Sequence, residues 1–220
     1  MHHFQYRNNN LYCENIKIED IAHNVGTPFY LYSYATLIDH FRKLKKAFSS
    51  INPVICFSMK SNSNLSVCRA LVKESAGLDI VSGGELFKAL KIGANPKKIV
   101  YASVGKTAIE IATAIKKGIL FFNVESIPEL LVIEKICKRY NRRVNVSLRI
   151  NPDVLAHTHS FITTGSSENK FGLDFTTAKG ILVKRMAFPH LDIIGLHVHI
   201  GSQIIDSGPF VKALKKTAQF

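Results

Sequence analysis

The chain has 220 residues, of which 46% are hydrophobic and 20% are charged, a balance typical of a globular protein with a buried core. This composition excludes a fully disordered chain, a collagen-like repeat and a low-complexity segment. Apolar runs such as residues 118–124 are far below the roughly 18 residues of a membrane span, and residues 1–10 lack the apolar segment of a signal peptide. We therefore expect a cytoplasmic protein without membrane contact.

The chain is strongly basic, with 29 Lys and Arg against 16 Asp and Glu and a formal net charge of +13. A basic chain can bind nucleic acid through its phosphates. Here the lysine pairs are spread along the chain, at positions 45–46, 97–98, 116–117 and 215–216, without interleaved aromatic residues. We therefore expect solvated helix faces and no nucleic-acid partner, with a basic field that attracts small anions.

The cysteines show neither a Cys-x-x-Cys pair nor the spacing of a zinc ribbon. They are Cys13, Cys56, Cys68 and Cys137. In a cytoplasmic protein we expect reduced thiols that pack as small apolar side chains.

Short apolar runs alternate with helical stretches, which predicts βαβ units and a parallel sheet. A strand is predicted over residues 28–34, followed by a helix on which Leu37, Phe41, Leu44 and Phe48 share one face. The six predicted core strands cover residues 54–59, 78–81, 99–102, 119–124, 144–150 and 193–200. Further helices are predicted from residue 64, over 176–186 and over 209–220.

Three more helices begin with a Ser or Thr that is followed three residues later by Glu, the pattern of a capping box. The pairs are Ser82 and Glu85, Thr107 and Glu110, and Ser126 and Glu129. Gly93 and Gly118 stand where a left-handed C-terminal cap is expected. Because capping explains Glu85, we do not count it among the site residues.

The candidate site residues cluster where the predicted strands end. They are Lys60, Asp79, Arg149 and His199. Both a (β/α)₈ barrel and a doubly wound sheet place their sites there, but the sequence contains no Gly-x-Gly-x-x-Gly and no phosphate-binding P-loop motif. A barrel needs eight strands, so we expect a TIM barrel truncated after about six.

Each candidate has a functional and a structural interpretation. Lys60 at the end of a buried strand suits condensation with an aldehyde, because burial lowers the pKa of an amine, although its side chain can also extend to solvent. Arg149 suits a carboxylate or phosphate, or else a surface ion pair. Asp79 on an apolar strand implies a cationic neighbour. Ser202, after Gly201, offers N–H and hydroxyl donors to an anion.

The histidines form two His-x-His pairs, His197 with His199 and His157 with His159. On a strand this spacing directs both rings to one face. Such pairs can bind a metal, form hydrogen bonds in a core, or stack on a bound aromatic ring, and the sequence leaves these uses open.

Six linked motifs together resemble the alanine-racemase-like, fold-type III pyridoxal-phosphate decarboxylases. They are Cys56-Phe-Ser-Met-Lys60-Ser-Asn62, Asp79-Ile-Val-Ser-Gly-Gly-Glu85-Leu, Gly118-Ile-Leu-Phe-Phe-Asn123-Val-Glu-Ser, Ser147-Leu-Arg149-Ile-Asn-Pro152, the segment from His157 to Gly172, and His197-Val-His199-Ile-Gly-Ser-Gln203. The combination is most similar to the branch of the family that decarboxylates meso-2,6-diaminopimelate to L-lysine, a homodimeric carboxy-lyase in lysine biosynthesis. The similarity begins at about Gly26.

This resemblance implies roles for five residues. Lys60 would form the internal aldimine with pyridoxal 5'-phosphate, and His199 would stack on its ring. Ser202 would contact the phosphate, while Asp79 and Arg149 would line the pocket. No metal ion is implied.

The resemblance also implies a domain division. Residues 1–34 would be an N-terminal extension that belongs to the β domain of the full-length family, and residues 35–220 an incomplete cofactor-binding barrel. The remaining strands and the C-terminal β domain would be absent, so we expect an N-terminal fragment that does not turn over substrate alone.

Four alternatives remain open at this point. An ornithine or arginine decarboxylase of the same fold would differ in the loop at residues 168–172, and a pyridoxal-phosphate homeostasis protein would need eight strands. A metal-dependent hydrolase would use the His-x-His pairs together with several carboxylates. A nucleic-acid-binding module would depend on net charge alone.

Overall fold

The structure, a computed structural model, describes residues 2–154 and 171–220 and is built around a six-stranded parallel sheet in the order β4-β5-β6-β7-β8-β9. The strands are β4 (Cys56–Ser58), β5 (Gly77–Ile80), β6 (Ile99–Ala102), β7 (Phe121–Val124), β8 (Val144–Arg149) and β9 (Leu191–His197). All six predicted strands are confirmed in their places, although several are shorter than predicted. Since β4 and β9 end the order, they form the two edges of this sheet.

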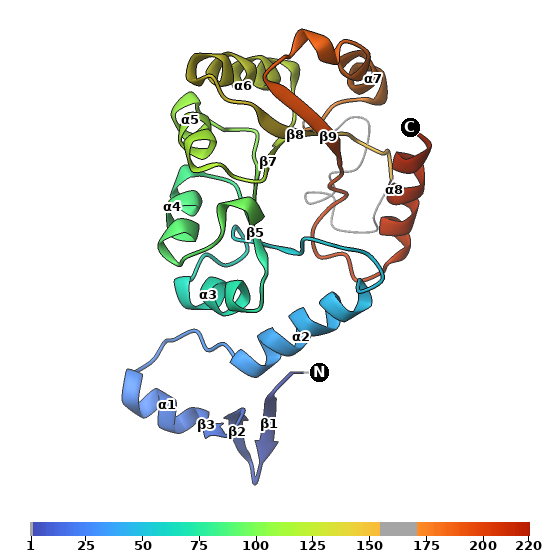
Figure 1. The fold of residues 1–220 in the computed structure, drawn as a ribbon. Helices are drawn as coiled ribbons and strands as arrows, with labels where there is room; N and C mark the ends of the chain where they lie inside the picture. The colour runs from blue at the N-terminus through green and yellow to red at the C-terminus, as the bar shows by residue number, and fades with distance from the viewer. Residues whose placement is uncertain (1, 155–170) are drawn as a thin grey trace.

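Helices follow the strands in turn and cover the outer side of the curved sheet (Figure 1). They are α3 (Leu65–Lys73), α4 (Gly83–Lys91), α5 (Ala108–Lys117), α6 (Ile127–Tyr140) and α7 (Phe175–Val183). Short 3₁₀ turns at η1 (Pro96–Lys98) and η3 (Arg185–Ala187) precede β6 and β9. Outside this run lie α2 (Tyr34–Ala47) and α8 (Gly208–Gln219). The strand–helix repetition confirms a parallel α/β architecture of barrel type.

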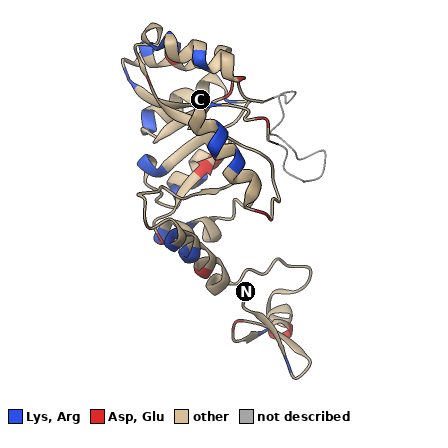
Figure 2. Ribbon diagram, turned by 90° about the vertical axis from the view of Figure 1, so that its right-hand side faces the viewer, with Lys and Arg blue, Asp and Glu red and all other residues tan. Residues whose placement is uncertain are grey.

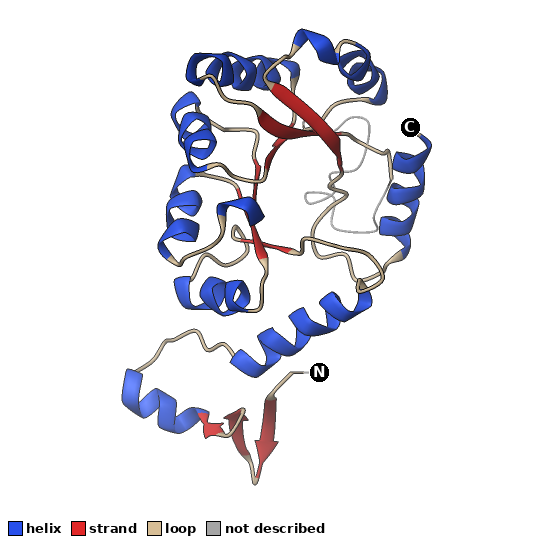
Figure 3. Cartoon of the chain, viewed as in Figure 1, coloured by secondary structure: helices blue, strands red, loops and turns tan. Residues whose placement is uncertain are grey.

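A second, small sheet precedes α2. It is antiparallel and contains β1 (Phe4–Arg7), β2 (Asn10–Cys13) and β3 (Ile16–Lys17), after which comes α1 (Ile18–Val25). Figure 3 shows this sheet apart from the parallel sheet, with α2 between them.

The strand predicted over residues 28–34 is wrong, because residues 28–33 have no regular structure and Tyr34 begins α2. Local polar contacts start the helix here. The hydroxyl of Ser33 accepts from the N–H of Thr36 at 3.0 Å, and the Glu14 carboxylate accepts from Ser33 Oγ at 2.8 Å. These contacts outweigh the strand preference of the aromatic residues before them.

The core lies between the parallel sheet and its helices, where large apolar side chains are fully buried. Examples are Leu78, Leu86, Ile99, Phe122, Leu130 and Leu148. The predicted apolar face of α2 is only partly correct. Leu44 and Phe48 are each 46% exposed, whereas Ile38, outside the predicted face, is buried. The helix therefore packs through a different and narrower stripe than its periodicity indicates.

The capping box of α5 is complete, because Thr107 and Glu110 exchange both hydrogen bonds. Gly118 ends the same helix at φ 67°, and Gly93 follows α4 at φ 81°, which confirms both left-handed caps.

The other two predicted capping boxes are only half formed. Ser82 and Ser126 accept from the expected N–H, but each glutamate binds the N–H before the cap residue. The cause is a rotation at the cap, since φ is −155° at Ser82 and −158° at Ser126 but −79° at Thr107. The bonds formed instead join Val81 N–H to Glu85 Oε2 and Glu125 N–H to Glu129 Oε2, both at 2.8 Å.

A bulge lies between β8 and β9, where Val146 pairs with Ile193 but Ser147 pairs with Gly195. The extra residue on β9 shifts the register of everything that follows. As a result His197 pairs with Arg149 at the carboxyl ends of the two strands.

Basic residues are distributed over separate helices, as predicted. The last turns of α2 and α5 contain Lys45, Lys46, Lys116 and Lys117, and Figure 2 shows Lys and Arg on several helices. Cations at helix C-termini are stabilised by the helix dipole. Within the described residues, no helix combines the length and apolarity needed to span a bilayer.

We predict opposite effects for alanine at two glycines. A Cβ on Gly77 would lie 2.5 Å from the Lys98 carbonyl oxygen and 2.6 Å from Cys56 Sγ, whereas a Cβ on Gly180 in α7 meets nothing within 4 Å. Gly77→Ala should therefore lower the free energy of unfolding by about 1–3 kcal/mol, and Gly180→Ala should raise it by about 0.5–1 kcal/mol. Denaturant titration measures both, and equal effects would contradict this account of β5 packing.

Candidate active site

One cavity of about 320 Å³ opens at the carboxyl ends of the parallel strands. Its lining includes Lys60, Asp79, Glu125, Arg149, Phe171, His197 and His199. The structure thus gathers four of the five predicted site residues, which come from β4, β5, β8 and β9 or the residues directly after them. The volume lies in the range of small-molecule pockets.

Lys60 lies in the turn after β4 and lines the cavity, but its side chain is exposed rather than desolvated as predicted. The reason is topological, because β4 is an edge of the described sheet. Lys60 nevertheless shares the cavity with His199, as the predicted site requires.

Asp79 accepts a hydrogen bond from a hydroxyl, and the predicted cationic neighbours, Lys60 and Lys106, act on it through their charge. Ser58 Oγ donates to Asp79 Oδ2 at 3.0 Å, while the buried Oδ1 has no partner among the described residues. Burial raises the pKa of this carboxyl, which the Ser58 hydrogen bond and the charge of Lys60 partly oppose. Asp79 therefore presents an unsatisfied oxygen in a cavity that it lines.

Arg149 binds a carboxylate, one of its predicted partners, in an ion pair that is buried rather than at the surface. Its Nη1 donates to Glu125 Oε2 at 2.7 Å, with the side chains 10% and 4% exposed. Its Nε is buried without a partner among the described residues, so donor capacity remains. Below this pair, Ser147 donates to Asn123, which continues the polar contact between β7 and β8.

Glu125 is a site residue that the sequence analysis did not single out, although its motif was recognised. It follows Asn123 by two residues, and strand alternation would place both on one face. That periodicity is the signal that could have identified it.

His197 and His199 both line the cavity, as their spacing predicts. Burial is the largest cause that lowers the pKa of His197 to about 3 and that of His199 to about 4, and the charge of Arg149 adds to it. Both imidazoles are therefore neutral at pH 7. His197 Nδ1 has no hydrogen-bond partner among the described residues.

Two predicted features do not join this site. Ser202 is exposed and is not part of the cavity lining. His157 and His159 lie outside the described residues, and within those residues no group of three His, Cys, Asp or Glu could hold a metal ion. The structure thus gives the metal-hydrolase alternative no support.

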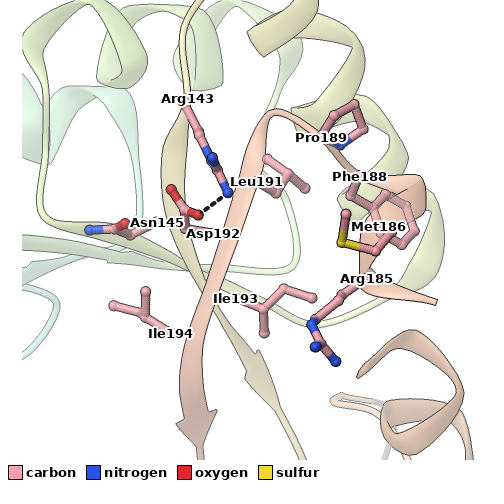
Figure 4. A pocket seen from close by; sticks show the side chains of 10 residues that line it. All are labelled: Arg143, Asn145, Arg185, Met186, Phe188, Pro189, Leu191, Asp192, Ile193 and Ile194. Atoms are coloured by element: carbon pink, nitrogen blue, oxygen red, sulfur yellow. Dashed lines mark ion pairs between the residues drawn. The ribbon is translucent and has the colours of Figure 1, made fainter. Parts of the chain in front are cut away.

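A larger cavity of about 580 Å³ lies beside the amino-terminal half of β9 (Figure 4). Arg143 and Asp192 form an ion pair across it at 2.5 Å, and much of the remaining lining is apolar. Because it lacks a nucleophile or a convergent set of polar groups, we assign the chemistry to the cavity at the carboxyl ends.

The donor set of the carboxyl-end cavity fits an anionic, aromatic aldehyde. Lys60 supplies a primary amine, which condenses with an aldehyde, and the imidazole of His199 can stack on a flat ring. The unpartnered Arg149 Nε and Asp79 Oδ1 provide a buried donor and acceptor for polar substituents.

We predict that Arg149→Met lowers the free energy of unfolding by about 3–5 kcal/mol, because Glu125 is left buried without its cation. The double variant Arg149→Met/Glu125→Met should lose less, since no unpaired charge remains. Arg42→Met, which breaks an exposed ion pair with Glu74, serves as the control and should have little effect. A double variant that is less stable than Arg149→Met would contradict the interpretation.

We also predict an acid-sensitive contribution from His197. Its pKa falls from 6.5 to about 3 on folding, so the unfolded chain binds more protons and stability is lost as pH falls through that range. His197→Gln should therefore make the free energy of unfolding less steep with pH, by at most about 1.4 kcal/mol per pH unit. His23→Gln, on a side chain that is 78% exposed, is the control and should keep the wild-type slope.

Residues 34–220 match the family described as pyridoxal-dependent decarboxylase, pyridoxal binding domain. Diaminopimelate decarboxylase of Neisseria meningitidis serogroup B is 41% identical over 206 residues, which cover 94% of this chain and 50% of that protein. The chain spans about half the length of the curated relatives it matches.

Solved structures give the same answer. The crystal structure of diaminopimelate decarboxylase from Helicobacter pylori complexed with L-lysine has a TM-score of 0.89 and 40% identity, covering 92% of this chain and 51% of that one. The M. jannaschii diaminopimelate decarboxylase in co-complex with L-lysine reaches a TM-score of 0.91 at 33% identity, covering 99% and 52%.

These similarities confirm the expected barrel class and the expected cofactor, pyridoxal phosphate. They do not favour a pyridoxal-phosphate homeostasis protein, a metal-dependent hydrolase or a nucleic-acid-binding module. Because the family match spans residues 34–220, this chain belongs to the pyridoxal-dependent decarboxylases and contains the pyridoxal-binding domain of that family.

Proposed function

We propose that the chain is the cofactor-binding part of a diaminopimelate decarboxylase, a carboxy-lyase that converts meso-2,6-diaminopimelate to L-lysine in lysine biosynthesis. One observation carries the proposal, namely the convergence of Lys60, Asp79, Arg149 and His199 on a single cavity at the strand carboxyl ends. The similarity to diaminopimelate decarboxylases at about 40% identity supports the substrate.

Each residue of the site has a distinct role in this proposal. Lys60 would hold the cofactor through its aldehyde, because a primary amine is the group that condenses with it. His199, neutral because burial lowers its pKa to about 4, would offer the cofactor a flat aromatic surface. Asp79 and Arg149 bind polar groups of the cofactor, and Ser202, three residues beyond His199, contacts its phosphate.

When bound, pyridoxal phosphate supplies the conjugated system that stabilises the carbanion left by loss of CO₂. The protein residues orient the groups that react and exclude competing water. Phe171 lies 5.9 Å from the Arg149 guanidinium, measured to the ring centroid, and covers part of the same cavity. It helps to desolvate the charges that face the ligand.

The proposal extends to organisation and location. We assign residues 1–34, with the sheet β1–β3, to the β domain of the whole enzyme and residues 35–220 to its barrel. We further propose a homodimeric, cytoplasmic enzyme that binds neither nucleic acid nor membrane. The four cysteines are free thiols, as expected in a reducing compartment.

The test of this function is covalent uptake of pyridoxal phosphate at Lys60. After incubation and borohydride reduction, peptide mass mapping should find the pyridoxyl group on Lys60, and Lys60→Ala should weaken cofactor binding at least about tenfold. Lys98→Ala is the control, because Lys98 is a lysine beside the amino end of β6, away from the cavity, where its Nζ donates to the Ser75 carbonyl oxygen. Equal labelling of many lysines in wild type and Lys60→Ala would contradict the proposal.

Turnover is measured on the whole protein. There, CO₂ release from meso-diaminopimelate should be lost in Lys60→Ala and kept in Lys98→Ala. Release from ornithine or arginine but not from diaminopimelate would overturn the substrate while leaving the cofactor site intact.

A further inference from the structure

Lys106 is a buried cation to which the proposed function gives no role. Its side chain is 0% exposed, and it lies in the segment between β6 and α5. Its Nζ donates to Ser103 O at 2.7 Å, to Asn123 O at 2.8 Å and to Glu129 Oε1 at 2.5 Å. An ammonium group has three donors, so these bonds saturate it and tie the loop after β6 to the end of β7.

Glu129 connects this cation to the cavity. While Oε1 binds Lys106, Oε2 accepts from the backbone N–H of Glu125 at 2.8 Å. The Glu125 carboxylate in turn holds Arg149 Nη1 at 2.7 Å. A continuous chain of contacts therefore runs from Lys106 to Arg149, and its last two members line the cavity.

The four charges of this chain sum to zero. Lys106 and Arg149 balance Glu125 and Glu129. The ring centroid of Tyr101 lies 5.6 Å from Lys106 Nζ, and the charge of Lys106 or Arg149 also acts on Asp79, His197 and His199. Burial lowers the pKa of Lys106 and raises that of Glu129, while the attraction between the two opposes both shifts. Loss of either partner would leave a buried charge uncompensated.

We propose that Lys106 is a positioning residue of the cofactor site. Its contact with Glu129 fixes the backbone of Glu125. The position of the Glu125–Arg149 ion pair in the cavity wall depends on that backbone. Lys106 does not touch the ligand, and it acts through Arg149 on an anionic, aromatic aldehyde. This inference rests on the proposed function, in which that ligand is pyridoxal phosphate.

The first test replaces Lys106 by Met, which has a similar length but no charge. Lys106→Met should raise the dissociation constant for pyridoxal phosphate about tenfold, measured by titration without substrate, while saturating cofactor still labels Lys60. The loss relative to wild type should grow as the pH rises, because burial raises the pKa of Glu129 and, without its cation, the buried carboxyl favours its protonated form.

The second test removes the anion instead of the cation and should reverse the direction of the pH dependence. Glu129→Gln leaves Lys106 without its anion, so the loss of affinity relative to wild type should grow toward low pH, where the buried amine must take up a proton. It also serves as the second variant in case Lys106→Met does not fold. In the double variant Lys106→Met/Glu129→Gln the amide oxygen still accepts from Glu125 N–H and no net charge is left, so affinity should recover and the pH dependence should flatten.

The control is Lys98→Met. It removes a lysine that binds a single backbone carbonyl beside the amino end of β6, so this variant should bind the cofactor like wild type. A pH-independent loss in Lys106→Met that Glu129→Gln does not rescue would show that Lys106 only fills space, and would overturn the inference.

A readout without cofactor separates this inference from the proposed function. In melting-temperature measurements, the losses of Lys106→Met and Arg149→Met should not add in the double variant, since the carboxylates that bind them, Glu129 and Glu125, are linked by a hydrogen bond. If wild type takes up no pyridoxal phosphate, the proposed function fails, but non-additive losses still support the linkage. Additive losses overturn the positioning role whether or not the cofactor binds.

Discussion

The arrangement of polar side chains at the carboxyl ends of β7 and β8 depends on one constraint: a charge that is buried in the sheet interior needs a partner. The interiors of barrels are usually filled by branched apolar side chains. Here Ser147 donates to Asn123 in one layer and Arg149 binds Glu125 in the next. Removing one member of a buried pair costs far more than removing both. These two contacts therefore hold β7 and β8 in their observed register.

The bulge in β9 also shapes the carboxyl end of the sheet. Ile194, the extra residue, is 53% exposed, so the bulge gains little from apolar burial. It does bring His197 opposite Arg149, where both line the cavity. A one-residue change of register would instead direct the ring to the other face of the sheet. The local irregularity thus serves the site more than the core.

The sequence predicts the strands of the parallel sheet well, because a strand buried on both faces is a continuous apolar run between helix caps. It fails where a longer-range partner decides the structure. Tyr30 and its neighbours have strand-like composition, but Tyr30 is 92% exposed and the strand does not form. The apolar stripe of α2 is misjudged for the same reason, since periodicity identifies a face but not what packs on it.

In the site, too, the features that depend on local sequence could be predicted, whereas those that depend on contacts between strands could not. Lys60, Asp79, Arg149 and His199 could be placed together because the strand carboxyl ends of a parallel sheet meet at one edge. The partner of Asp79 could not be predicted, since it depends on the pairing of Ser58 with Asp79 across two strands. Glu125 was missed because its role depends on the register that places Asn123 beside Ser147.

The electrostatic state of the cavity follows from these pairings. With pKa values of about 3 and about 4, His197 and His199 are neutral at pH 7, so each ring offers a flat surface, one N–H donor and one acceptor nitrogen. Burial pushes the Asp79 carboxyl in the opposite direction, toward keeping its proton. Burial thus favours the neutral form of the Asp79 carboxyl and of both imidazoles alike. The imidazoles of His197 and His199 are kept neutral by burial and by the charge of Arg149, which stabilises anions on the cavity surface.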